Sequence, residues 1–288
     1  MNNFIKYFLV AVLFFFIGYS FQDKYATLFK KETLPFSKLE QIKNKKILNA
    51  IVVNSPTVYY FGNNKEEGFE YELLEAYSKD IGVELNLTVV STISEALKLS
   101  AKGLADITSA AITKTVKREK IYNFGPSYYQ VQQQVICSRN LFKKAKFPNS
   151  LEDLIGLNIM VGENTTYESS LIEAKKMNPN IIYTVSPEFS SSQLLEMVSK
   201  NKIDCTIADS NIFSINQRYY PRLSFAFSIS EKESLSWIMR KDSETLINDM
   251  YRWLNIYIQN GDMAKLKDKY YGHINIFVSI QIPNFTAL

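Results

Sequence analysis

The sequence contains very little histidine or cysteine. His273 is the single histidine among 288 residues, which removes most metal sites and the Ser-His and Cys-His classes of nucleophilic catalysis. Two cysteines, Cys137 and Cys205, are too few for a disulfide framework. Each lies in an apolar run, so we expect buried free thiols, with a single bridge between them as the alternative. The sequence therefore predicts no metal site and no cofactor.

Charge and hydrophobicity are both moderate. The formal net charge is +4, too small and too scattered to indicate a nucleic-acid partner. The longest apolar run, from Tyr7 to Tyr19, is short for a membrane span, which needs ~20 residues. Lys6 precedes it, as in a secretory signal. Two interpretations stay open, a cleaved signal peptide and an uncleaved anchor over residues 1–21. Both predict an exported chain in the periplasm or cell envelope, and the anchor, which is favoured, also tethers it to the membrane.

Strands and helices are predicted to alternate in the same order twice. Apolar runs and amphipathic periods indicate strand, helix, strand, helix and strand, an order typical of a parallel sheet flanked by helices. These predicted elements cover residues 47–53, 71–82, 83–90, 93–103 and 105–111, and then 157–161, 166–177, 181–185, 192–201 and 204–208.

The two halves also match residue by residue. The segment 95–108, "EALKLSAKGLADIT", aligns without a gap on 193–206, "QLLEMVSKNKIDCT", so that Asp106 meets Asp204. We therefore predict an α/β fold of two similar lobes, each a mainly parallel sheet, joined by two crossover strands that act as a hinge. The predicted boundaries are a tether at 22–45, lobe 1 at 46–129 plus 229–272, lobe 2 at 130–228, and a tail at 273–288.

Polar residues follow the ends of equivalent strands in the two halves. Thr113 and Arg118 follow the strand at 105–111, and Asp209 follows its counterpart. Ligands of open parallel sheets sit at these carboxyl ends. Arg118 can grip a carboxylate and Asp209 suits an ammonium, which together describe an α-amino acid or the end of a peptide.

Thr165 and Thr166 open a helix whose N-terminal amides favour an anion. Simpler interpretations remain beside these. Arg118 lies in a basic run of the kind that is usually solvated. Asp209, Thr165 and Thr166 are also ordinary helix-capping residues.

Several segments resemble the family 3 extracellular solute-binding proteins. The resemblance lies in "GFEYELLEAYSKDIGVELNL", "ADITSAAITKTVKREKIYNFGPSYY" and "DCTIADSNIF". It implies a two-lobed fold of the periplasmic-binding-protein type II class, with the ligand carboxylate on Arg118 and the ligand amine on Asp209. It further implies ligand-binding positions at Thr113, Thr165, Thr166, Tyr60 and Glu72. Ala111 stands where the family often has glycine, and its methyl group would narrow the approach of a ligand to the backbone.

Within that family, the segments "PSYYQVQQQVICSR" and "KYYGH" are similar to the binding domain of membrane-bound lytic murein transglycosylases. Those enzymes have a further catalytic domain that supplies a glutamate, and the tail 273–288 contains no acidic residue. We therefore expect a non-catalytic binding protein that closes over an amino acid or a peptidoglycan-derived peptide. The alternative is a transglycosylase whose catalytic domain is missing. Expected partners are an ABC permease or the cell-wall machinery.

Overall fold

A single compact unit begins at Ser37. The computed structural model describes residues 36–62 and 64–272. The predicted N-terminal hydrophobic helix, almost all of the tether and the tail at 273–288 lie outside the described residues. Among the described residues, no helix is both long enough and apolar enough to cross a membrane.

The first half of the fold, called lobe 1 here, has the predicted alternation of strands and helices. Its main elements are β1 (Ile47–Val53), α3 (Phe69–Asp80), β4 (Glu84–Val90), α4 (Ile93–Ala101) and β5 (Ile107–Ser109). Four short elements are added to it, namely α2 (Lys38–Lys45), β2 (Tyr60–Gly62), β3 (Lys65–Glu67) and α5 (Val116–Glu119). Strand β1 is almost entirely buried, as expected for a strand with parallel neighbours and helices on both faces.

The second half, called lobe 2 here, repeats this order. It contains β7 (Ile159–Gly162), α7 (Thr166–Met177), β8 (Tyr183–Ser186), α8 (Ser191–Ser199) and β9 (Cys205–Asp209). The additional elements are α6 (Asn140–Lys143), a short 3-10 helix at Glu152–Leu154, and α9 (Ser210–Tyr219). Helix α8 starts at a capping box, in which Ser190 and Gln193 each accept a hydrogen bond from the other's backbone N–H.

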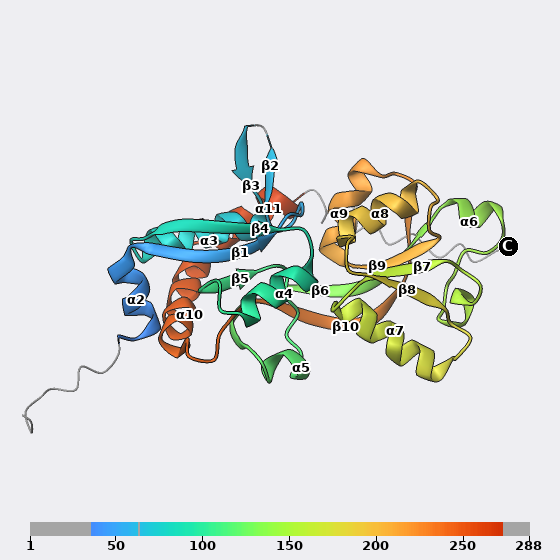
Figure 1. Cartoon of the computed structure of the whole chain (residues 1–288). Coiled ribbons are helices and arrows are strands. Elements are labelled where there is room, and N and C mark those ends of the chain that lie inside the picture. The colour runs from blue at the N-terminus through green and yellow to red at the C-terminus, as the bar shows by residue number, and fades with distance from the viewer. Residues whose placement is uncertain (1–35, 63, 273–288) are drawn as a thin grey trace, which may run out of the picture. The chain divides into compact units, whose positions relative to one another are not determined.

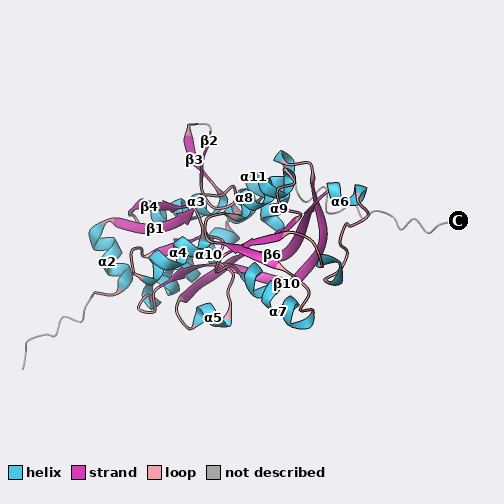
Figure 2. Ribbon diagram, turned by 45° about the vertical axis from the view of Figure 1, so that its right-hand side comes forward, coloured by secondary structure: helices cyan, strands magenta, loops and turns pink. Residues whose placement is uncertain are grey.

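Two long strands join the lobes. β6 (Asn123–Ser138) and β10 (Leu223–Met239) pair antiparallel and run from one lobe into the other (Figure 1). After β10, helices α10 (Glu244–Gln259) and α11 (Asp262–Tyr271) pack on lobe 1. The sheet has the order β4-β1-β5-β10-β6-β9-β7-β8, in which each lobe contributes three strands on its side of the long pair. Figure 2 shows β6 and β10 as the central ribbons of this sheet.

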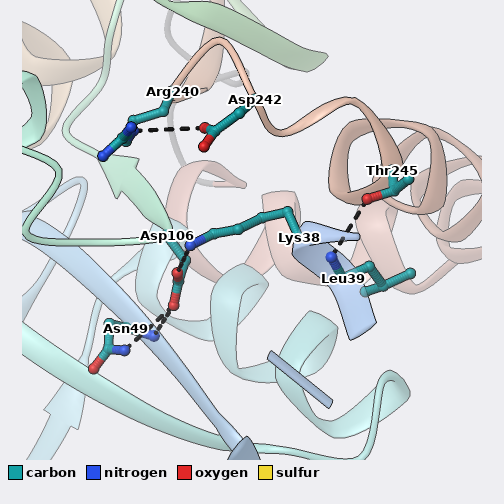
Figure 3. Close-up of polar contacts among 7 residues, drawn as sticks. All are labelled: Lys38, Leu39, Asn49, Asp106, Arg240, Asp242 and Thr245. Atoms are coloured by element: carbon teal, nitrogen blue, oxygen red, sulfur yellow. Dashed lines mark hydrogen bonds and ion pairs between the residues drawn. The ribbon is translucent and has the colours of Figure 1, made fainter. Parts of the chain in front are cut away.

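The aligned residues Asp106 and Asp204 make the same hydrogen bonds in their two lobes. Asp106 Oδ2 accepts a hydrogen bond from Asn49 N at 2.9 Å, and Asp106 N donates to Asn49 O at 2.9 Å. In lobe 2, Asp204 and Asn158 make the same two bonds at the same two distances. Asp106 makes two further contacts, a hydrogen bond from Asn49 Nδ2 at 3.3 Å and an ion pair with the ammonium of Lys38 in α2 at 2.6 Å (Figure 3). The predicted duplication is thus present down to the hydrogen bonds of single side chains.

The expectation of free thiols was wrong. Cys137 and Cys205 form a disulfide, and they lie directly opposite one another on the paired strands β6 and β9. Both are fully buried in the core of lobe 2. The apolar runs around the two cysteines suggested inert thiols. They are in fact two adjacent strands of one buried sheet, and this brings the cysteines together.

Candidate functional site

Arg118 is a buried cation in a basic surface segment. It lies in α5, where its backbone N–H donates to Oγ1 of the N-cap residue Thr115 at 3.3 Å. The side chain is 9% exposed, whereas Lys117 and Lys120 on either side are exposed. Its Nη1 donates to the carbonyl oxygen of Thr113 at 2.9 Å, which fixes the guanidinium against lobe 1. The simple interpretation of a solvated basic run therefore does not hold for Arg118.

The same guanidinium also bonds the other lobe. Arg118 Nη2 donates to the carbonyl oxygen of Asn164 at 2.9 Å. Asn164 has a φ of 59°, in the left-handed region, and precedes the N-cap of α7. Beside it, Ser94 of lobe 1 donates to Glu163 Oε2 at 2.7 Å and accepts from Asn164 Nδ2 at 2.9 Å. The two lobes are thus held together by direct hydrogen bonds at the edge of the cleft.

Asp209 ends strand β9 as a buried carboxylate with an open acceptor. It is 2% exposed, and its Oδ1 has no hydrogen-bond partner among the described residues. It occupies the N-cap position of α9, but its side chain makes no capping bond. Its backbone N–H donates to the Tyr167 hydroxyl at 3.2 Å. A carboxylate in this condition has room for a donor that the protein does not supply.

The charges of Arg118 and Asp209 act on one another. Burial and, to a smaller extent, the charge of Glu233 raise the pKa of Asp209, Tyr167 and Arg118 oppose this shift, and the resulting pKa is about 7. Burial lowers the pKa of Arg118, while Tyr167, Asp209 and Glu233 oppose that change. An arginine remains protonated in spite of such a shift. A guanidinium from lobe 1 and a carboxylate from lobe 2 therefore lie within electrostatic range of each other.

Glu70 supports the strand end in lobe 1, and it was not identified from the sequence. It is 1% exposed, accepts from Ala111 N at 3.0 Å and bonds the Ser109 hydroxyl. Burial raises its pKa to about 7. Tyr167 performs the equivalent task in lobe 2, since Glu70 and Tyr167 are the second residues of the corresponding helices α3 and α7. The signal available in the sequence was an acidic residue two positions into α3, where a helix faces the strand ends.

Ala111 has a φ of 50°, in the left-handed region that favours glycine. Its amide is used inside lobe 1 by Glu70, so it is not free to bind a ligand. The residue nevertheless lines a small cavity between the lobes, together with Ile93 and Thr165. Alanine adopts this backbone conformation at a cost of roughly 1 kcal/mol, which a glycine at the same position would avoid.

The two threonines before α7 have different surroundings. Thr165 is the N-cap, and its hydroxyl accepts from Glu168 N at 3.3 Å and donates to Gly162 O at 2.7 Å. Thr166 is the first helical residue, is 9% exposed and lines the groove that also contains Arg118. The capping interpretation is therefore confirmed for the Thr165 hydroxyl, while both residues stand beside the cleft.

Tyr60 and Glu72 lie away from Arg118. Tyr60 lines a separate opening of about 500 Å³ between the lobes, next to Arg218 and Tyr270. Burial and the neighbouring Glu67 raise its pKa to about 12. Glu72 bonds Lys269 and Tyr270 of α11. Arg118 thus lines one groove with Thr165 and Thr166, bonds Thr113, and interacts electrostatically with Asp209. Ala111 lines the adjoining small cavity with Thr165, while Tyr60 and Glu72 lie outside this group.

The cavity between the lobes that is lined by Ala111 and Thr165 is small in this state. Its volume is about 30 Å³, whereas ligand sites typically measure roughly 300–1,000 Å³. A molecule the size of an amino acid can enter this cavity only if the lobes separate. The long strand pair β6 and β10 is the segment that such a motion would bend.

This chain is similar to known proteins in both its sequence and its fold. "Membrane-bound lytic murein transglycosylase F" of Pseudomonas fluorescens is 32% identical over 242 residues, 83% of this chain and 49% of its own length. The protein of the same name in Aeromonas hydrophila is 32% identical over 252 residues, 87% of this chain and 50% of its own length. The chain thus spans about half the length of the curated relatives it matches.

Among solved structures, a mutant of the protein ArgBP from T. maritima superposes with a TM-score of 0.73 at 19% identity, covering 82% of this chain and 99% of that one. An L-arginine-bound ABC transporter substrate-binding protein, AbpA of Streptococcus pneumoniae, has a TM-score of 0.68 at 22% identity, with 81% and 98% covered. These confirm the predicted fold class. The model of the bacterial extracellular solute-binding proteins, family 3, matches residues 48–273, so the chain belongs to that family.

Proposed function

We propose that the cleft binds an amino acid or a peptidoglycan-derived peptide between Arg118 and Asp209, and that the lobes close over it. One observation carries this proposal above the others. Asp209 is a fully buried carboxylate with an unpartnered Oδ1, and it lies within electrostatic range of a buried guanidinium from the opposite lobe. An α-ammonium supplies the missing donor, and an α-carboxylate attached to the same carbon suits Arg118.

Each neighbouring residue has a stated part in this proposal. Thr113 fixes Arg118 through its carbonyl oxygen and offers its hydroxyl beside the guanidinium. Thr165 and Thr166 present the start of α7 from the other lobe, and Ala111 forms part of the wall. Tyr60 stands at the opening, where it can contact only a ligand that extends beyond the amino-acid head. Glu72 has no direct contact with the ligand in this arrangement.

Binding measurements on the full chain test the proposal. Calorimetry against a set of amino acids and muropeptides should find a ligand, and Arg118→Ala should weaken its binding at least about 100-fold, the size expected for a buried charge-assisted contact. Lys120→Ala is the matched control, since it removes an exposed cation two residues away. Unchanged affinity in Arg118→Ala, with the fold intact by circular dichroism, would defeat the assignment.

A second candidate follows from the relatives. Their printed name is that of a lytic transglycosylase, so this chain would correspond to the binding half of a cell-wall enzyme. We propose that the 288-residue chain binds without cleaving. A zymogram on purified peptidoglycan decides this, and clearing by the chain would support the enzymatic alternative.

The proposed location is the cell envelope, with an N-terminal tether to the membrane. The family is described as extracellular, and the relatives are named membrane-bound. The buried Cys137–Cys205 disulfide also suits an oxidising compartment. Proposed partners there are an ABC permease or the cell-wall machinery. Copurification from detergent-solubilised membranes would test both the tether and the partner.

A further inference from the structure

The groove beside Arg118 is acidic although the whole chain is basic. The formal net charge of the chain is +4. The groove between α4, α5 and α7 has a volume of about 1440 Å³ and contains more carboxylates than cations. Its lining glutamates are Glu95, Glu163, Glu168, Glu173, Glu188 and Glu233, against the cations Lys98, Lys117 and Arg118.

Among these glutamates, Glu233 is the one that acts electrostatically on both Arg118 and Asp209, the proposed binding pair. It lies on the hinge strand β10, opposite Val131 of β6, and is half-buried. Gln133 Nε2 donates to its Oε2 at 2.7 Å, and Ser170 Oγ donates to Gln133 Oε1 at 2.8 Å. This chain of hydrogen bonds orients the carboxylate. No ion pair among the described residues involves Glu233, so its charge is not neutralised by a lysine or arginine side chain in direct contact.

Glu233 acts electrostatically on both members of the binding pair. Its charge raises the pKa of Asp209 and opposes the burial-driven fall in the pKa of Arg118. When Asp209 is ionised, Arg118, Asp209 and Glu233 together carry one positive and two negative charges. An amino acid with a neutral side chain brings no net charge, and it leaves this excess negative charge uncompensated in a poorly solvated site.

A second observation is geometric and also favours a cation at this site. Asp209 is 2% exposed, keeps an unpartnered Oδ1, and lies opposite Gln133 on the paired strands β6 and β9, the residue whose Nε2 donates to Glu233. An α-ammonium satisfies that oxygen, and after that the Glu233 carboxylate still has no cationic partner. A second ammonium or a guanidinium on the ligand would neutralise it.

We propose that Glu233 is a specificity-determining residue that makes the cleft prefer a basic amino acid, one with a positive group besides its α-ammonium. This inference rests on the proposed function, because it concerns the same site. It assigns to Glu233 a role that is separate from the gripping of the ligand head by Arg118 and Asp209.

Pairs of ligands of similar shape test the inference on the full chain. L-Lysine is compared with L-norleucine, and L-arginine with L-citrulline, since each pair differs mainly in the side-chain charge. Calorimetry should show the charged member binding at least about tenfold tighter, which is the effect expected of one charge at intermediate dielectric. Equal affinities within both pairs, or no binding by any of the four, would overturn the inference.

Variants at two positions of β10 connect the preference to Glu233. Glu233→Gln keeps an acceptor for Gln133 and removes the charge, so the preference should shrink about tenfold through weaker binding of the charged ligands. Glu233→Asp should retain the preference. Glu231→Gln is the matched control, because Glu231 is exposed on the same strand. An unchanged ratio in Glu233→Gln would reject the inference while leaving the proposed function intact, provided that Arg118→Ala still abolishes binding.

Discussion

Lobe 1 and lobe 2 have the same topology but are stabilised differently. Lobe 1 is built around aromatic side chains, with the rings of Tyr77, Trp237 and Trp253 packed at centroid distances of 5.0–6.4 Å. The core of lobe 2 is mainly aliphatic and contains the Cys137–Cys205 disulfide. A duplicated α/β pattern thus specifies the order of elements, while each copy has its own means of stabilisation.

The two lobes also differ in the residue that stands at the equivalent strand end. Ala111 and Asp209 occupy equivalent positions, and the backbone N–H of each donates to the second residue of the corresponding helix, Glu70 of α3 or Tyr167 of α7. Lobe 1 thus places its buried carboxylate behind the strand end. Lobe 2 places its carboxylate at the strand end itself. Only the second arrangement leaves an acid available to a ligand.

Removing the disulfide should destabilise the protein most. Cys137 and Cys205 are 68 residues apart in sequence, so their link restricts a long loop in the unfolded chain, an effect of about 4 kcal/mol in the entropy model. We expect the double substitution of both cysteines by alanine to lower the free energy of unfolding by an amount of that order, measured by urea denaturation. Dithiothreitol should destabilise the native protein and leave the double variant unaffected. A variant as stable as the native protein would show that lobe 2 does not depend on its covalent link.

The affinity for the ligand should depend on pH through Asp209. The pKa of Asp209 is raised to about 7 in the folded, ligand-free protein, and an ammonium binds only the ionised form. Binding of an amino acid should therefore release a proton and weaken by about tenfold for each pH unit below 7. Calorimetry in buffers of different ionisation enthalpy measures the released proton.

Stability should change with pH in the opposite direction. A raised pKa of an acid favours folding at low pH, and this contribution is lost as the pH rises from about 4 to about 7. Asp209→Asn should therefore make the ligand-free protein more stable above pH 7 while it weakens binding. Glu70 titrates in the same range, so the pH profile of Asp209→Asn must be compared with that of the native protein. A profile unaltered by the substitution would contradict the assignment to Asp209.

The smallest expected effect is the difference in unfolding free energy between variants of the equivalent residues Asp106 and Asp204. Asp106→Asn and Asp204→Asn should each cost about 1–2 kcal/mol, because each weakens one charge-assisted hydrogen bond to a backbone N–H. The Lys38 pair and a hydrogen bond from Asn49 Nδ2 at 3.3 Å belong to Asp106, and the ion pair should add up to about 0.5 kcal/mol to the first value. Denaturation of both variants at low and high salt measures the salt-dependent part of the difference. A larger cost at Asp204 would contradict this prediction.

Much of the fold could be predicted from the sequence because it depends on local periodicity and on the internal match. Arg118 and Asp209 could be selected as candidate site residues because strand ends in a parallel sheet converge on one edge; their role in binding stays a prediction. The disulfide was missed, since it depends on the register of β6 against β9, which apolar runs do not encode. Glu70 was missed because a shift of two residues along α3 decides which glutamate faces the strand end. The contact of Arg118 with a main-chain carbonyl has no signature in side chains at all.

That last contact has a consequence for how tightly any solute is held. The carbonyl of Asn164 already occupies one arm of the Arg118 guanidinium when the lobes are together. If a carboxylate bonds Arg118 as proposed and takes the same Nη2 donor, it replaces this bond, and its net gain is the difference between two acceptors. Side-chain substitution cannot delete a backbone oxygen, but it can alter the left-handed turn that positions it. We therefore expect the residue at position 164 to influence the affinity of the proposed site.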